Sequence, residues 1–221
     1  RSDFVVVSAE KLLESKAKFN EKTFLIRHGV DFVHFRKSLD PATEIPAEVA
    51  NLPKPIIGFH GLLADWVDFA LIKKTAEHFK EGSVVLIGKI TVDAEKKIKI
   101  LDNIPNIHFL GRKPYTELPN YCKAFDVALN PFEISELTLA ANPLKVREYL
   151  AAGLQVVSTD IPEIRILEDC LAGADHDDFI AKIEHVLANP KPRAEVSDAI
   201  AHESWDAKVD ELRVIMQKVK E

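Results

Sequence analysis

Five short apolar runs, each followed by glycine or a small polar residue, constrain the fold of this chain more than any other feature. The runs cover residues 55–61, 83–88, 106–111, 126–130 and 155–159. Segments with apolar residues at helical spacing separate them, as in 65–79 and 115–124. Apolar strands that alternate with helices are typical of parallel sheets buried on both faces. The sequence therefore predicts an α/β fold: a Rossmann-like open parallel sheet with helices on both faces.

The residues that follow these runs indicate where a ligand binds. In open parallel sheets, ligands bind at the carboxyl ends of the strands. At the predicted strand ends stand His60-Gly61, Gly88-Lys89, Gly111-Arg112-Lys113, Asn130-Pro131 and Thr159-Asp160. Glycine, short polar and basic residues suit a phosphorylated, nucleotide-like ligand, so we expect the site at this edge.

The segment 142–153 reads Asn-Pro-Leu-Lys-Val-Arg-Glu-Tyr-Leu-Ala-Ala-Gly and predicts a sharply bounded helix. Asn142 is a good N-cap, Pro143 fits the first helical position, and Gly153 suits the left-handed residue after the last turn. The unpaired N–H groups of such a helix start, together with the helix dipole, favour an anion such as a phosphate.

Glu148 lies one to two turns into this helix, where its carboxylate could accept hydrogen bonds from sugar hydroxyls. The alternative is a well-capped packing helix on which Lys145 and Glu148 form an exposed i,i+3 pair. The spacing leaves both interpretations open.

The composition limits which ligands the protein is expected to bind and in which cellular compartment it is expected to work. The 221 residues carry a net charge of −6, which disfavours broad nucleic-acid binding and requires any phosphate site to be local. Cys122 and Cys170 have neither metal-ligand spacing nor a disulfide framework, as in proteins of a reducing compartment. No apolar run reaches the ~18 residues of a membrane span. We expect a cytoplasmic protein, with peripheral association at the inner face of the membrane as an option for the full-length protein.

Three segments together carry a family resemblance: Asn-Ile-His-Phe-Leu-Gly at 106–111, Ala-Phe-Asp-Val-Ala-Leu-Asn-Pro-Phe at 124–132, and 142–159, where the helix is followed by Val-Val-Ser-Thr. They resemble the C-terminal donor-binding domain of retaining GT-B glycosyltransferases, the large bacterial group 1 (family 4) enzymes, and especially the teichuronic-acid-type branch. The close match covers residues 55–163. More loosely, residues 3–8 and 29–31 resemble the last strand of the N-terminal domain and the hinge after it.

The resemblance implies a set of roles. Glu148 would bind the donor ribose, and Lys89 and Arg112 would line the nucleobase pocket. Residues contacting the diphosphate would be Gly61, Asn142, Pro143, Leu144 and Lys145. The donor would be a nucleotide sugar, such as a UDP- or GDP-sugar, with no further cofactor and no metal, because helix N–H groups and basic side chains neutralise the leaving diphosphate. No catalytic residue is assigned.

Two positions depart from the family pattern. Ala140 stands where the family's first glutamate is expected, eight residues before Glu148, and the nearby Glu133 and Glu136 are out of register. The Arg and Lys that the family usually has after its first-strand glycine are also absent, since residues 61–66 read Gly-Leu-Leu-Ala-Asp-Trp. Lys145 or Arg112 could supply that missing charge.

The resemblance also predicts how the chain is organised. Residues 1–54 would be a remnant of the N-terminal domain with the hinge, 55–203 the nucleotide-sugar-binding domain, and 204–221 the C-terminal crossover helix. The chain begins with Arg1 rather than Met, which indicates a fragment or a processed chain. The resemblance implies that most of the acceptor domain is missing, so we expect this chain alone to bind donor but not to complete the transfer. The remaining partners would be a saccharide or lipid-linked acceptor. A homodimer could form through the apolar face of the last helix, which carries Trp205, Val209, Leu212 and Ile215.

Three functions remain in competition. The leading hypothesis is a retaining, metal-independent glycosyltransferase acting in polysaccharide or glycoconjugate synthesis. The second is a Rossmann-like scaffold or partner domain that has lost donor binding, which Ala140 favours. The third is a phosphosugar epimerase, for which His60 with Glu133 is the one pair that the sequence nominates.

Overall fold

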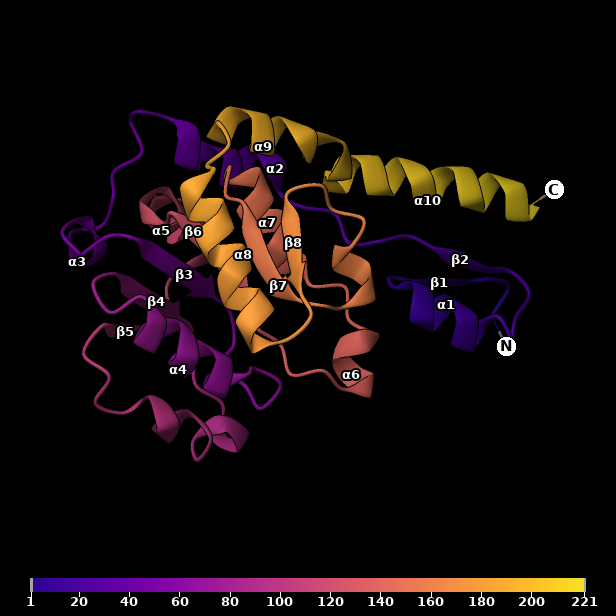
Figure 1. Cartoon of the computed structure of the whole chain (residues 1–221). Coiled ribbons are helices and arrows are strands. Elements are labelled where there is room, and N and C mark those ends of the chain that lie inside the picture. Colours follow the sequence, from indigo (N-terminus) through magenta and orange to yellow (C-terminus); the bar gives the residue numbers. More distant parts are fainter. Residues whose placement is uncertain (1, 221) are drawn as a thin grey trace.

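The computed structural model describes residues 2–220, and its main body is a single six-stranded parallel sheet (Figure 1). The strand order is β5-β4-β3-β6-β7-β8, and every neighbouring pair is parallel. The strands are β3 (Ile56–His60), β4 (Ser83–Ile87), β5 (Ile107–Gly111), β6 (Val127–Asn130), β7 (Val156–Thr159) and β8 (Cys170–Gly173). The order reverses between β3 and β6, as in doubly wound Rossmann-like sheets. The predicted fold class is confirmed.

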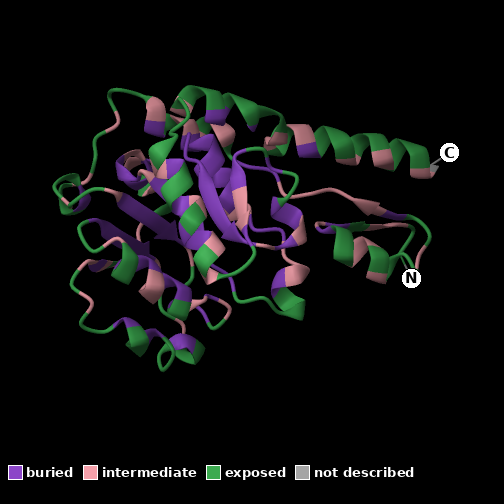
Figure 2. Cartoon of the chain, viewed as in Figure 1, coloured by how far each residue is buried: buried purple, intermediate pink, exposed green. Residues whose placement is uncertain are grey.

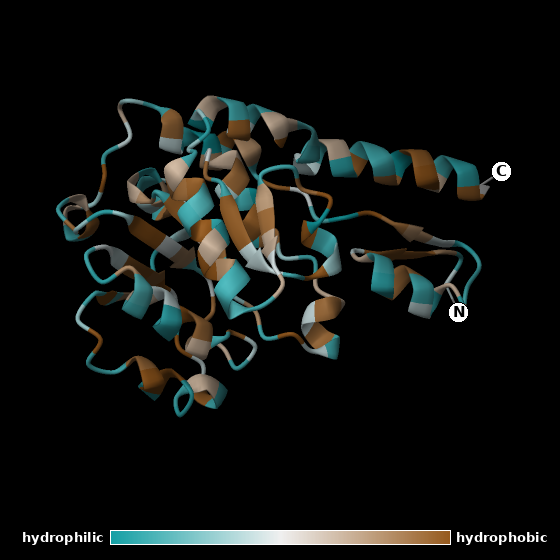
Figure 3. Cartoon of the chain, viewed as in Figure 1, coloured by the Kyte–Doolittle hydropathy of each residue, from teal (hydrophilic) through white to brown (hydrophobic). Residues whose placement is uncertain are grey.

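Two apolar cores lie on opposite faces of this sheet, because side chains alternate along each strand. Ile56, Val85 and Ala128 point into one core, which packs against α2 (Phe32–Arg36), α5 (Leu118–Ala124) and α7 (Leu144–Ala151). Ile57 and Val84 point into the other core, which packs against α4 (Phe69–His78) and α8 (His176–Ala188). The four inner strands β3, β4, β6 and β7 are accordingly buried in Figure 2 and largely apolar in Figure 3.

The remaining helices connect or flank this body. The α-helices are α1 (Glu10–Lys16), α3 (Ala47–Ala50), α6 (Glu136–Leu139), α9 (Arg193–Ala199) and α10 (Trp205–Lys220). The 3₁₀ helices are η1 (Lys37–Leu39), η2 (Val92–Ala94), η3 (Ile98–Leu101), η4 (Tyr115–Glu117), η5 (Pro162–Ile164) and η6 (Ala201–Glu203). Among the described helices, none combines the length and apolar character needed to cross a membrane.

Short helices and caps complete these connections. Residues 92–101 carry two separate 3₁₀ helices, η2 and η3, and the segments 38–55 and 131–141 contain the four-residue helices α3 and α6. Helix α8 is capped by Asp175, whose carboxylate accepts from the amides of Asp177 and Asp178. The left-handed conformation predicted for Gly153 is present, with φ of +77°.

A small N-terminal unit stands outside the main sheet. Strands β1 (Val5–Val7) and β2 (Thr23–Leu25) pair in parallel with α1 between them. Helix α10 projects from the main body toward the same side (Figure 1). The segment that follows β2 and the segment that precedes α10 hydrogen-bond to each other. The Val30 amide donates to the Glu203 carbonyl, and the Trp205 amide donates to the Val30 carbonyl.

Candidate functional site

A cavity of about 200 Å³ opens at the carboxyl ends of β3, β4 and β5. It is lined by His60, Gly61, Leu62, Ile87, Gly88, Lys89, Arg112, Lys113 and Leu118. Three residues that the sequence nominated for ligand binding, Gly61, Lys89 and Arg112, therefore meet in one cavity. It lies beside the point where the strand order reverses, which is where ligands bind in sheets of this type.

Lys145 reaches this edge from the first turn of α7. Gly61 has φ of +138°, and a β-carbon there would lie 2.8 Å from Lys145 Cε. The Lys145 ammonium stands 4.8 Å from the ring centroid of Phe59 and 4.5 Å from that of Phe132. Glycine at position 61 thus leaves room for a cation that the two aromatic rings hold in place.

Lys145 and Glu148 do not form the exposed pair that was considered from the sequence, because α7 is packed into the body of the protein. Glu148 is buried and Lys145 is partly buried. Burial raises the pKa of Glu148 to about 7, even though the Lys145 charge lowers it. Burial likewise lowers the pKa of Lys145 to about 8, against the pull of Glu148. The site is therefore largely shielded from solvent, and both groups have pKa values close to neutral pH, where their charges can change.

Aromatic residues from distant parts of the chain surround Glu148 and its neighbour His60. The Tyr115 hydroxyl faces the Glu148 carboxylate, and burial followed by that charge raises the pKa of Tyr115. The buried His60 ring packs between the rings of Phe35 and Tyr149. Burial, and then the Lys145 charge, lower the pKa of His60 to about 3, so its imidazole is neutral.

The start of α7 differs from the sequence prediction. Pro143 is the N-cap, the helix begins at Leu144, and no side chain caps it. Asn142 does not cap the helix because its amide is occupied elsewhere: Nδ2 donates to the Ser8 carbonyl at 2.6 Å, and Oδ1 accepts from Arg147 Nη1 at 2.6 Å. The Val146 amide closes the first turn on the Pro143 carbonyl. The amides of Leu144 and Lys145 are then first-turn donors without a partner inside the helix.

Arg147 lies in a hydrogen-bond network that joins the start of α7 to segments near both ends of the chain. It is fully buried, and its Nε donates to Glu203 at 3.1 Å while Nη1 donates to Asn142. The Asn142 carbonyl also lies 3.0 Å from His28 Nδ1. Sequence reasoning missed this network, together with Tyr115 and Tyr149, because most of its contacts join residues far apart in the chain. The one available signal was an arginine at helical spacing from Leu144 and Leu150.

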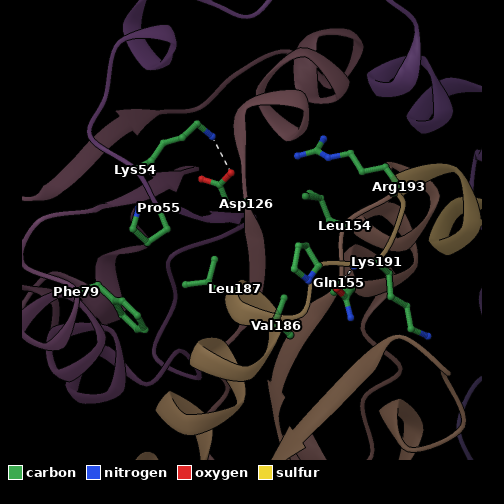
Figure 4. A pocket seen from close by; sticks show the side chains of 12 residues that line it. Lys54, Pro55, Phe79, Asp126, Leu154, Gln155, Val186, Leu187, Lys191 and Arg193 are labelled. Atoms are coloured by element: carbon green, nitrogen blue, oxygen red, sulfur yellow. Dashed lines mark hydrogen bonds and ion pairs between the residues drawn. The ribbon is translucent and has the colours of Figure 1, made fainter.

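A second pocket, of about 630 Å³, opens at the opposite edge of the sheet, before β3, β6 and β7 (Figure 4). Its charged side chains already have partners: Lys54 pairs with Asp126 at 2.7 Å, and Lys191 pairs with Asp169 at 2.8 Å. Arg193 donates to the Cys122 carbonyl at 3.3 Å. These groups hold the fold together, so the carboxyl edge remains the better candidate site.

Carboxylates do not gather around a metal in the part of the chain that is described. Within residues 2–220, no group of three or more His, Cys, Asp or Glu side chains is arranged to hold a metal ion. Of the pair nominated for an epimerase, Glu133 is exposed, whereas His60 is buried and lies beside Glu148.

Comparison with known proteins supplies the family. The sequence profile described as "Glycosyl transferases group 1" matches residues 54–189, which contain the whole six-stranded sheet and α7. The chain belongs to this family. The group 1 profile ends before α9, so the network around Arg147 and Glu203 joins the matched region to a segment outside it.

One curated relative matches this group 1 chain at low sequence identity. TuaH of Bacillus subtilis (strain 168), named for a glycosyltransferase role in teichuronic acid biosynthesis, is 26% identical over 191 residues. The match covers 84% of this chain and 47% of TuaH, so the chain spans about half the length of that curated relative.

Two solved structures share the architecture. The HepE protein of Anabaena, in complex with UDP and glucose, has a TM-score of 0.75 at 14% identity, covering 98% of this chain and 64% of HepE. The catalytic domain of starch synthase IV from Arabidopsis thaliana, bound to ADP and acarbose, has a TM-score of 0.70 at 14% identity, covering 100% of this chain and 56% of the synthase. At such identities the likeness establishes the fold alone.

Proposed function

We propose that this chain is the donor-binding part of a retaining, metal-independent glycosyltransferase that uses a nucleoside-diphosphate sugar such as a UDP- or GDP-sugar. The observation that carries the proposal is the position of Lys145 and Glu148, which stand one turn apart on α7 beside the cavity that Gly61, Lys89 and Arg112 line.

In this proposal the diphosphate lies at the start of α7. The first-turn amides of Leu144 and Lys145 and the Lys145 ammonium would bind its oxygens, since a helix N-terminus and a cation both favour an anion. Lys145 would then provide the charge that Leu62 and Leu63 cannot. Lys89 and Arg112 would wall the nucleobase, and Glu148 would accept hydrogen bonds from the ribose.

The reaction then needs charge stabilisation more than an enzyme nucleophile. The bond between the anomeric carbon and the phosphate oxygen breaks, and its electron pair stays on the nucleoside diphosphate. An acceptor hydroxyl would form the new carbon–oxygen bond on the face that the diphosphate leaves, which retains the configuration, and would pass its proton to the departing diphosphate oxygen. Positive groups placed at the diphosphate stabilise the charge that develops on it, which lowers the barrier without a metal.

The acceptor would approach from the side of the N-terminal unit. We propose that a saccharide or lipid-linked acceptor is bound mainly by residues outside this chain, at the cytoplasmic face of a membrane in the full-length protein. The half-exposed Trp205 and Val209 of α10 would pack against that acceptor domain. A homodimer through the same face is the alternative, and the oligomeric state in solution distinguishes the two.

A scaffold that has lost donor binding is the second candidate. Ala140 favours it, because the family's first glutamate is missing and the nearby Glu133 and Glu136 are exposed. The enclosed Lys145–Glu148 pair supports the enzyme instead, since burying two ionisable groups costs stability that a mere packing helix does not need.

A thermal-shift titration with UDP, GDP, ADP and TDP separates the two candidates. A ligand that binds only the folded state stabilises it, by about 2.7 kcal/mol at one hundred times Kd. We expect one nucleotide to raise Tm, Glu148→Ala to abolish the shift, and the exposed control Glu133→Ala to preserve it. The absence of a shift at millimolar concentration of all four nucleotides would favour the scaffold.

A further inference from the structure

The imidazole of His60 carries a buried polar atom that lacks a partner. The residue is 4% exposed, and within the described part of the chain its Nε2 makes no hydrogen bond. The backbone of His60 is already engaged, since its N–H donates to the Tyr149 hydroxyl at 2.6 Å. Buried polar atoms are nearly always hydrogen-bonded, so an unpartnered Nε2 beside a cavity points to a bound group.

Glu148 places a second polar group next to this atom. Its Oε2 lies 3.8 Å from His60 Nε2, which is too long for a direct hydrogen bond. Two groups at that separation can instead each bind one of two neighbouring hydroxyls on the same molecule. His60 also lines the cavity of about 200 Å³ that holds Gly61, Lys89 and Arg112.

We propose that His60 Nε2 and the Glu148 carboxylate together bind the two ribose hydroxyls of the nucleotide, and that His60 thereby makes the site select ribose over deoxyribose. The inference rests on the proposed function and adds a residue to it. A hydroxyl both donates and accepts, so either tautomer of the neutral imidazole can bond one. The carboxylate accepts from the other hydroxyl.

Entry of the ribose requires a local rearrangement. Nε2 is covered in this structure, and the Tyr115 hydroxyl faces the Glu148 carboxylate. Residue Tyr115 is 47% exposed, and its ring contacts His34 and Phe35. In this proposal its side chain moves toward solvent, and a ribose hydroxyl takes its place at Glu148. A deoxynucleotide would leave either Nε2 or the carboxylate unpaired, which makes its binding weaker.

Titration calorimetry with UDP, 2′-deoxy-UDP and 3′-deoxy-UDP tests this, with the GDP series alongside because the base is open. The variants are His60→Phe, which keeps the ring contacts with Phe35 and Tyr149 but has no Nε2, and His60→Gln, whose amide reaches close to the Nε2 position. We expect the parent protein to bind each deoxynucleotide about tenfold more weakly than the ribonucleotide.

His60→Phe should bind UDP about tenfold more weakly and should no longer distinguish UDP from one of the two deoxy forms. His60→Gln should restore part of that distinction, which a purely structural role would not explain. If His60→Phe discriminates against both deoxynucleotides as strongly as the parent, the inference is overturned. If the parent binds neither UDP nor GDP, the proposed function fails and this inference fails with it.

Discussion

The side chain of Lys145 occupies the space that a β-carbon on Gly61 would need. Lys145 Cε lies 2.8 Å and Nζ 3.1 Å from that position, although the two residues belong to the β3 loop and to α7. The contact brings a cation from one helix onto the strand end where the cavity opens. It also makes the ligand site sensitive to a single methyl group.

Gly61→Ala is therefore expected to weaken nucleotide binding by pushing Lys145 away from the loop. The positive φ adds backbone strain of about 1–2 kcal/mol to the folded state. Gly111→Ala is the matched control, because Gly111 also has positive φ, of +66°, but a β-carbon there meets no atom within 4 Å. Calorimetry with UDP and urea unfolding of both variants measure the two effects. Equal affinity losses in both variants would show that the Lys145 contact is unimportant.

Glu148 should make the folded protein less stable as the pH rises from about 4.5 to about 7. Its folded pKa is raised to about 7 from an ordinary value of 4.5, so the unfolded chain releases this proton first. Below pH 4.5 Glu148 is protonated in the folded and the unfolded chain, so it costs no stability. Above pH 7 it is ionised in both, and the full cost of burying its charge is present. Glu148→Gln cannot titrate, so at pH 7.5 it should exceed the parent in unfolding free energy by on the order of 1–3 kcal/mol.

The comparison must be made between the two proteins at each pH. His60, whose pKa is lowered to about 3, acts in the opposite direction between pH 3 and 6.5, and it does so in both proteins. Urea unfolding at pH 4.5, 6 and 7.5 gives the difference directly. A difference that does not grow between pH 4.5 and 7.5 would mean that Glu148 ionises normally.

Asn142→Ala should destabilise the fold because it leaves the buried Arg147 guanidinium short of an acceptor. The change also removes the donor to the Ser8 carbonyl. Loss of a buried partner of a charged group costs about 2–3 kcal/mol. The exposed Asn189, whose amide donates to the His185 carbonyl, provides the control, with an expected cost below about 1 kcal/mol. Similar unfolding midpoints in urea for both variants would show that the hydrogen bonds of Asn142 add little to the stability of the fold.

Glu163 should anchor the N-terminal unit on the main body. Its buried carboxylate accepts from the Glu10 amide at 2.6 Å and from Arg27 Nε at 2.7 Å. Glu163→Ala is expected to speed proteolytic cleavage within residues 2–28 several-fold, because local opening becomes easier while the six-stranded sheet stays intact. Mass spectrometry of the fragments locates the cuts. Exposed Glu168→Ala should cleave like the parent, and an unchanged pattern in Glu163→Ala would contradict the anchoring role.

The sequence predicts the sheet well and the site only in part, for physical reasons. Apolar runs such as 83–88 are short and fit buried strands, so the strands and the parallel sheet follow from local pattern. The strand order does not, because it depends on contacts between segments far apart in the chain. The glycines at the ends of these runs are also part of the local pattern, and they mark the edge of the sheet where the ligand is expected. The predicted cap at Asn142 is wrong, because its side-chain amide instead donates to the Ser8 carbonyl and accepts from Arg147.

The same limit applies to the depth of the site. That Lys145 and Glu148 are enclosed depends on packing by Phe59, Phe132 and Tyr115, which come from three other segments. Helix spacing alone allows an exposed pair just as well. Short helices such as α6 were missed because four residues carry too little periodicity to distinguish them from a loop.

Hydrogen–deuterium exchange with and without UDP tests the location of the site most directly. If the nucleotide lies at the start of α7, UDP slows exchange in peptides covering residues 60–66 and 142–150 and leaves peptides covering 186–193, at the opposite pocket, unchanged. Lys145→Met should reduce this protection, whereas Lys73→Met on the outer side of α4 should not. Protection confined to 186–193, or no protection at saturating UDP and GDP, would contradict a donor site at α7.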